Sequence, residues 1–440
     1  MEKSSGACLR LNCGIASTSM LFRELMVFDK QIPSGRIDRT DPQREIMQGD
    51  AANSSTRSPA IGWRRALAGG LYHTGLLRIV KHISRQYELG ATPESGGAFL
   101  RKAALPKFLI LCYHRVGTGG VPLYSELSPD VFEAQMRFLK EQYRIVSLEQ
   151  ICQGLQEPTT AEPSVAITFD DGYRDVYRHA FPILRAYNLP ATVFLIADSV
   201  DTGQVSWYDR IFLALQVMPA GRLEVELDRL WCFELTSRVS RLRAATDIIS
   251  CLRKLPNDRR KECCADLDGR VELPAEQLEG CMLNWEEVQI MQQAGLTFGS
   301  HTVTHPVVSR LTAVEMEYEL TESKRRLEAG LRAPVRDFAF PFGHVEDCGT
   351  EAAAALRKCG YRSAVTTVPG VNAPSANPFA LRRVQIGEEH ASLSMFAFYL
   401  TEQFLLASRT QSDVAMELES TSLQRKPRDP SRAVGGPRRA

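Results

Sequence analysis

The stretch VAITFDDGYRDVY, residues 165–177, places two carboxylates side by side where an apolar run ends. Residues 165–169 are typical of a buried strand, and Asp170 and Asp171 follow it directly. Neighbouring carboxylates repel each other, so a cation or a shared proton is expected between them at the edge of a buried sheet. The simpler alternative is that the pair caps a helix beginning near Arg174.

Short apolar strands alternate with amphipathic helices on both sides of this stretch. Such alternation predicts a parallel sheet, and about seven or eight units favour closure into a barrel. We therefore predict an α/β fold, a distorted barrel of about seven strands with a helical insertion, over residues 107–405. The expected strands are 107–113, 143–147, 165–169, 191–197, 296–300, 337–340, 362–367 and 382–386. The expected helices are 130–142, 148–156, 174–188, 285–294, 312–329 and 350–358.

The segments that flank the barrel differ from it in composition. Residues 1–60 have no sustained period and are predicted to be a disordered leader, as is the basic tail at 406–440. Residues 61–90 are predicted to form an amphipathic helix, and 91–106 a linker. The helix, most regular over 61–87, either packs on the next domain or contacts a membrane surface.

Residues 201–282 interrupt the alternation of strands and helices. We interpret them as an insertion that is helical through WYDRIFLALQ (207–216) and through the charged stretch that ends at Cys264. Insertions in such folds usually lie on the face that carries function. This insertion is therefore expected to shape a binding cleft.

The overall composition argues against several classes of protein. The 440 residues carry a formal net charge of +1, so no global field recruits nucleic acid. The 11 cysteines form no CxxC pairs and fit a reducing compartment better than a disulfide framework. No apolar run reaches the roughly 20 residues of a membrane span. Since the N-terminus also lacks a secretion signal, we expect a cytoplasmic protein, with peripheral membrane contact through 61–87 as an open alternative.

Three polar clusters follow strands, at the end of a barrel where functional groups gather. They are Asp170–Asp171, the pair His301 and His305 in HTVTHP, and PFGH at 341–344. Two imidazoles and one carboxylate form a three-ligand set that leaves a position for water, the pattern of catalytic zinc and its neighbours. Pro306 disfavours helical geometry at His305, which indicates a loop. Alone, the HxxxH spacing is a weak signal and is more typical of two ordinary surface or core histidines.

Taken together, TFDDGY (168–173) and SHTVTHP (300–306) resemble the first two signature motifs of the polysaccharide deacetylase, or NodB-homology, family of carbohydrate esterases. The resemblance covers roughly residues 107–390 and includes LCYHRVG at 111–117. It implies a hydrolase that removes acetyl groups from N-acetylated glycans such as chitooligosaccharides, peptidoglycan or exopolysaccharide. The implied cofactor is a divalent metal, Zn²⁺ ahead of Co²⁺, Ni²⁺ or Mn²⁺.

Carried over by position, Asp170 resembles the family's general base, and Asp171, His301 and His305 resemble its metal ligands. A bound cation lowers the pKa of its water toward about 7, and Asp170 would take the remaining proton as oxygen attacks the acetamide carbon. The third motif matches FAFPFG, which implies that the amide of Phe342 stabilises the oxyanion. A purely structural role for that aromatic residue is the alternative.

The sequence departs from the family pattern in two places. Many members carry a base-orienting arginine in the third motif, but this chain has Ala339 there, and Arg382 or Arg383 is a candidate substitute. The late Leu-x-His element that supplies the acid is not evident, because GEEHASL around His390 matches it poorly. We predict instead that His114, beyond the first strand, protonates the leaving amine; the alternative is a histidine bonded to a loop carbonyl.

Substrate contacts are predicted from Trp207, Tyr208, Pro341 and Arg382. Exposed Trp and Tyr rings suit stacking on sugar faces, although such a pair is also typical of packed core. Three other functions stay open: a carbohydrate-binding or assembly protein without turnover, a glycosidase using Asp170 with another carboxylate, and an O-acetyl esterase, which shares every residue named. The polymer, the metal and the oligomeric state do not follow from the sequence.

Overall fold

The computed structural model describes residues 67–70, 72, 107–118, 126–157, 162–274, 278–374 and 376–406. The predicted leader and linker, nearly all of the helix predicted at 61–90, and the tail after residue 406 lie outside the described residues. Among the helices that are described, none has the length and hydropathy that crossing a membrane requires. The nine cysteines within the described ranges are all free thiols.

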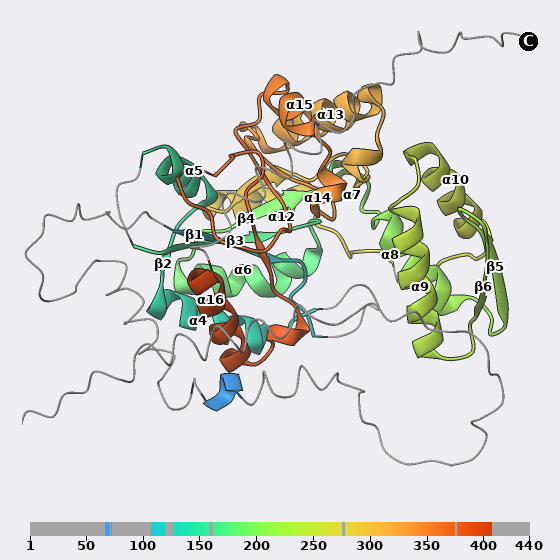
Figure 1. Ribbon diagram of the computed structural model, residues 1–440, viewed down its shortest axis with the longest axis horizontal. Coiled ribbons are helices and arrows are strands. Elements are labelled where there is room, and N and C mark those ends of the chain that lie inside the picture. The colour runs from blue at the N-terminus through green and yellow to red at the C-terminus, as the bar shows by residue number, and fades with distance from the viewer. Residues whose placement is uncertain are drawn as a thin grey trace, which may run out of the picture. The chain divides into compact units, whose positions relative to one another are not determined.

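A parallel sheet forms the centre of the fold (Figure 1). Its strands are β1 (Phe108–Tyr113), β2 (Arg144–Ile145), β3 (Ser164–Phe169), β4 (Thr192–Leu195), β7 (Thr297–Ser300), β8 (Asp337–Ala339), β9 (Ser363–Val365) and β10 (Val384–Gln385). The strand order is β10-β1-β3-β4-β7-β8-β9, and β2 pairs with the start of β3. Every neighbouring pair is parallel, so the carboxyl ends of the strands gather on one side.

The two edges of this sheet meet. Leu381 forms a parallel bridge with Val365 of β9, and β10, which follows shortly after, pairs with β1. The segment 381–385 therefore contacts both edges and closes the sheet. This closure confirms the predicted fold class, a distorted α/β barrel.

Helices follow most strands and begin at defined caps. Ser128, Ser147, Asn284 and Thr312 each accept a hydrogen bond from a backbone N–H of the first helical turn, which satisfies a donor left unpaired there. The helical segments outside the insertion are α4 (Pro129–Gln142), α5 (Leu148–Gln156), η2 (Val176–Ala180), α6 (Phe181–Tyr187), α7 (Ala197–Thr202), α12 (Trp285–Gln293), η3 (Val308–Arg310), α13 (Ala313–Leu331), α14 (Val345–Cys348), α15 (Ala352–Lys358), η4 (Glu388–His390) and α16 (Leu393–Leu406).

Side chains along the strands alternate between an outer and an inner core. Leu109 and Leu111 of β1 pack in a cluster with the helices, whereas Phe108 and Ile110 pack with Phe194 of β4 in a cluster built mainly from strand residues. Gly299 of β7 belongs to the inner face, and a Cβ there would overlap the ring of Phe194. The inner face is therefore filled by apolar residues at mid-barrel, and buried polar residues lie toward the ends of the strands.

The insertion after α7 has its own core. It comprises α8 (Trp207–Val217), a hairpin of β5 (Arg222–Glu226) and β6 (Leu230–Glu234), α9 (Arg238–Leu252) and α10 (Asn257–Asp268). Its apolar residues form a cluster separate from the barrel clusters. The helical interpretation of this region was wrong over the hairpin, where β5 alternates exposed and buried residues as a half-buried strand does.

Candidate functional site

The carboxyl ends of β3 and β7 bring Asp171, His301 and His305 together. Nε2 of each histidine lies 3.4 Å from Asp171 Oδ1, and all three side chains are buried. Two ligand atoms bound at 2.0–2.2 Å to a tetrahedral ion lie roughly 3.4 Å apart. A nitrogen–oxygen hydrogen bond is usually shorter, near ~2.9 Å. The spacing therefore suits three ligands of one ion better than hydrogen-bonded pairs.

The polar atoms of this trio are those that a cation would satisfy. Within the described ranges, Asp171 Oδ1 is buried and accepts no hydrogen bond. His301 Nδ1 lies 2.8 Å from the carbonyl oxygen of Ala339, and donating its proton there leaves the Nε2 lone pair available. Burial lowers the pKa of His305 to about 3, so that imidazole stays neutral. The residues present fit a divalent cation.

The backbone around the trio is strained. In the described part of the chain six non-glycine residues have positive φ, and four of them are Asp171 (71°), Thr302 (70°), His305 (57°) and Phe342 (60°). The other two end helices, where this conformation is common. Each such residue costs of order 1–3 kcal/mol and persists only where its surroundings impose it. The strain is concentrated where the ligands are positioned.

Asp170, next to Asp171 in the chain, is bound on both oxygens by Arg383. Arg383 Nη1 lies 2.7 Å from Oδ1 and Nη2 lies 2.6 Å from Oδ2, and the two side chains are 0% and 2% exposed. Burial alone would raise the pKa of this carboxyl, but the charges of Arg383 and His301 outweigh it and hold the pKa below its ordinary value. Asp170 is therefore an anion held in one orientation.

Of the two arginines considered as substitutes for the missing third-motif arginine, Arg383 is the one that contacts Asp170. Successive side chains of a strand point to opposite faces, so only one of two neighbouring arginines can enter the barrel. Arg383 does so, whereas Arg382 is half-buried and donates to the carbonyl of Pro369 at 3.1 Å. A substrate contact by Arg382 stays a prediction.

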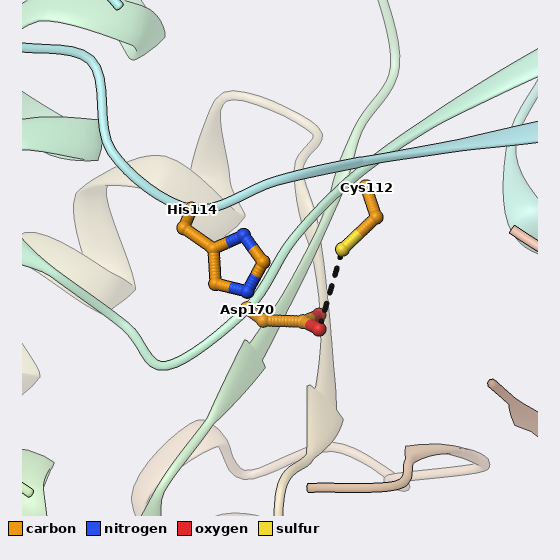
Figure 2. Close-up of side chains that lie close together, drawn as sticks. All are labelled: Cys112, His114 and Asp170. Atoms are coloured by element: carbon orange, nitrogen blue, oxygen red, sulfur yellow. Dashed lines mark hydrogen bonds between the residues drawn. The ribbon is translucent and has the colours of Figure 1, made fainter. Parts of the chain in front are cut away.

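His114 and Cys112 lie beside Asp170 (Figure 2). The thiol of Cys112 donates to Asp170 Oδ2 at 3.4 Å, and one ligand atom from each of the three residues lies within 4.8 Å of the others. His114 is half-buried. We did not predict Cys112 from the sequence, although its position two residues before His114 in a strand indicates the same face.

Phe342 and Pro341 border the trio from the loop after β8. The Phe342 ring lies 5.0 Å from that of His305, and the hydroxyl of Thr367 donates to the Phe342 carbonyl at 2.6 Å. No backbone acceptor in the described ranges takes the Phe342 amide N–H. Pro341 is buried and its carbonyl accepts the amide of Gly343 at 2.7 Å.

Trp207 and Tyr208 both contact the second histidine. The indole N–H of Trp207 donates to the carbonyl of His305 at 2.9 Å, and the Tyr208 ring lies 4.9 Å from the imidazole. Tyr208 is only 7% exposed, which favours the packing alternative for this residue. Sugar stacking by the half-buried Trp207 stays a prediction.

Glu319 of α13 is a supporting residue that we did not predict. Its Oε2 accepts the amides of Val303 and Thr304 at 2.7 and 3.1 Å, and its Oε1 accepts the Thr304 hydroxyl at 2.6 Å. The carboxylate thereby holds the loop between the two histidines. A glutamate in a charged helix carries no sequence signal of such a role.

Comparisons with known proteins agree with this geometry. The sequence model of the family described as Polysaccharide deacetylase matches residues 157–364. The Bacillus subtilis protein YxkH, named for the same family, is 22% identical over 291 residues, covering 66% of this chain and 75% of its own. A poly-β-1,6-N-acetyl-D-glucosamine N-deacetylase of Staphylococcus epidermidis is 28% identical over 141 residues, 29% of this chain and 46% of that relative.

Two solved structures are also similar to the chain. Streptococcus pyogenes deacetylase PplD in complex with acetate has a TM-score of 0.46 and 20% identity, covering 67% of this chain and 97% of its own. IcaB from Ammonifex degensii has a TM-score of 0.44 and 21% identity, and the match covers 66% of this chain and 97% of the IcaB chain.

Proposed function

Because the chain belongs to the polysaccharide deacetylase family of hydrolases, we propose that it removes N-acetyl groups from a glycan with the help of a divalent cation. Asp171, His301 and His305 would hold that cation. The observation that carries the proposal is the buried Asp171 Oδ1, unpartnered within the described ranges and 3.4 Å from each of two imidazole nitrogens. When bound, the cation supplies a Lewis acid that polarises the acetyl carbonyl and makes water more acidic. Two nitrogens and one oxygen favour Zn²⁺.

The remaining steps belong to side chains of the barrel. Asp170, kept ionised by Arg383, takes a proton from the attacking water as its oxygen joins the acetyl carbon. The amide N–H of Phe342 donates to the oxyanion that develops. His114 protonates the leaving nitrogen as the carbon–nitrogen bond breaks, so the products are acetate and a free amine. Both acid and base lie at the carboxyl ends of adjacent paired strands, β1 and β3.

The Staphylococcus epidermidis relative supports a polymer of N-acetylglucosamine as the substrate. The chain spans less than half of that relative's length, so the polymer's linkage is part of the proposal. An O-acetyl esterase would need the same acid, base and cation, and the choice of substrate in the assay separates the two.

Acetate release tests the proposed base. The apoprotein, reconstituted with Zn²⁺, is expected to release acetate from N-acetylglucosamine oligomers. Asp170→Asn should lower the rate by about 10³-fold or more while retaining the ion, because general-base catalysis typically contributes 10²–10⁴-fold. Asp337→Asn is the matched control, since Asp337 is also buried and bound by an arginine, Arg362. Near-normal turnover by Asp170→Asn would overturn the assignment.

A pair of substrates tests the proposed acid. His114→Ala should lose more rate on an acetamide than on an activated acetyl ester, because a good leaving group needs little protonation. The measurement is the ratio of the two kcat/KM values in wild type and variant. Equal losses on both substrates would assign His114 another role, and activity on O-acetylated glycans alone would favour the esterase.

A further inference from the structure

Strand pairing places a second set of potential ligands next to the first. Cys112 of β1 is in register with Thr168 of β3, so the residues two places further on, His114 and Asp170, are also opposite each other. The backbone confirms that pairing continues, because the Asp170 amide donates to the carbonyl of Tyr113 at 3.0 Å. Cys112, His114 and Asp170 therefore project from the same face of two adjacent strands (Figure 2).

These three residues offer a thiol, an imidazole and a carboxylate. One ligand atom of each lies within 4.8 Å of the others, and the thiol sulfur is 3.4 Å from Asp170 Oδ2. A sulfur at 2.3 Å and an oxygen at 2.0–2.2 Å from one tetrahedral ion would be roughly 3.6 Å apart. We propose that Cys112, His114 and Asp170 form a second site for a thiophilic divalent cation such as Zn²⁺, and that filling it inhibits the enzyme.

Arg383 leaves a coordination position on Asp170. Each carboxylate oxygen can accept two bonds, and on Oδ2 one comes from Arg383 and the other from the Cys112 thiol. A cation that replaces the thiol proton uses that second position, so the arginine contact is kept. The S–H bond breaks, a sulfur–metal bond forms and the proton passes to solvent, with no change in oxidation state.

The second site is the weaker of the two. Arg383 and a cation in the first site already place positive charge nearby, and like charges repel at these distances. We expect the first equivalent of metal to fill the Asp171 site and only an excess to fill the second. Soft thiolate ligands favour zinc, cadmium and cobalt over magnesium and manganese, so the inhibition is expected to be metal-selective.

Filling the second site occupies the proposed acid and base together. With a cation on His114 and Asp170, neither residue can transfer a proton. The inhibition rests on the proposed function, whereas the binding does not. Binding and turnover are therefore measured separately.

Cobalt titration of the full-length apoprotein reports on both sites, because a thiolate ligand to Co²⁺ gives a near-ultraviolet charge-transfer band. The first equivalent should restore acetate release without that band. The second should produce the band and lower the rate by about 10-fold or more, as loss of acid–base catalysis would. Excess Mg²⁺ should not inhibit.

Cys112→Ser should bind the first equivalent of Co²⁺ and lack the charge-transfer band. Excess Co²⁺ should not inhibit this variant, when its rate is compared with the rate of the same variant at one equivalent. The matched control is Cys152→Ser, because Cys152 is another buried thiol, on α5, and should behave as wild type. His114→Gln is a second variant that should lose the band even if the serine variant does not fold.

Two results would overturn the inference: no thiolate band in wild type with excess Co²⁺, or a band that persists in Cys112→Ser. If the band appears as expected but the first equivalent gives no acetate release, the proposed function fails and the second site stands.

Discussion

Asp170 and Asp171 are neighbours in the chain and similarly buried, yet they face two different pockets. In what we call the arginine pocket, Arg383 binds both carboxylate oxygens of Asp170 and also donates to the Thr168 hydroxyl. His301 and His305 surround Asp171 in the histidine pocket, where Oδ1 has no hydrogen-bond partner in the described part of the chain. The protein neutralises the first carboxylate with its own arginine, and the second is the carboxylate at which we propose that an ion binds.

The two pockets differ in whether their contribution to folding stability depends on a bound metal. The Asp170–Arg383 pair is complete in the folded chain itself, and removing one partner of such a buried pair typically costs about 3–5 kcal/mol. In the histidine pocket, by contrast, Asp171 Oδ1 has no hydrogen-bond partner among the described residues, so that carboxylate lacks a compensating interaction unless a cation binds. A ligand that binds only the folded state stabilises it by mass action. The histidine pocket should therefore stabilise the fold chiefly when metal is present.

The largest expected effect comes from His301→Ala. This change removes a ligand of the histidine pocket, so the metal bound per chain and acetate release should both fall to background. Metal analysis after gel filtration, together with the acetate assay, measures this. His179→Ala is the control, because His179 lies on η2 and is not one of the three clustered ligands, so the variant should retain both metal and activity. A His301→Ala protein that kept its metal would show that the histidine pocket is not the metal site.

An intermediate effect is expected from Arg383→Met in the arginine pocket. Turnover needs ionised Asp170, so the rate falls as pH drops through the pKa of that carboxyl. Arg383 lowers this pKa, and its removal should raise it. The acidic limb of kcat/KM against pH should then move to higher pH, and Arg383→Lys, which keeps the charge, should move it less.

The control for this change is Arg362→Met. Arg362 binds Asp337 at 2.8 and 3.0 Å at the amino end of β8, the opposite end of the strand from the functional groups. Removing the Arg362 guanidinium should lower the folding stability but leave the profile of kcat/KM against pH unchanged. An unchanged profile in Arg383→Met would mean that Asp170 is not the group whose ionisation limits the rate.

The smallest effect is expected from Glu319→Gln, which supports the histidine pocket from outside. An amide has only one acceptor oxygen, so it cannot hold both the Val303 and Thr304 amides and the Thr304 hydroxyl. Metal affinity should fall about 10-fold, the low end for residues that orient metal ligands. Competition with a chelator measures it. Glu317→Gln, at an exposed ion pair with Lys358, should leave metal affinity unchanged. An equal loss of affinity in both variants would mean that Glu319 has no specific role in supporting the histidine pocket.

The local sequence pattern was enough to predict the polar motifs that follow the strands. The apolar run before Asp170 and the spacing of His301 and His305 predicted a barrel and a three-ligand set, because strand period and ligand chemistry are properties of neighbouring residues. The same reasoning left Arg382 and Arg383 as equal candidates. It also missed the hairpin of β5 and β6, where the charged residues suggested a helix. In the structure, exposed and buried residues alternate along β5, as they do in a half-buried strand.

Sequence alone determined the order of the barrel strands, the two motifs and the chemical types of the ligands, since each depends on residues close together in the chain. Only the tertiary structure decided that Arg383 binds Asp170, that Cys112 and His114 face it, and that Glu319 holds the histidine loop. These contacts join residues far apart in the chain, up to 213 positions for Arg383 and Asp170. The Arg383 contact forms because closing a parallel barrel brings its first and last strands side by side.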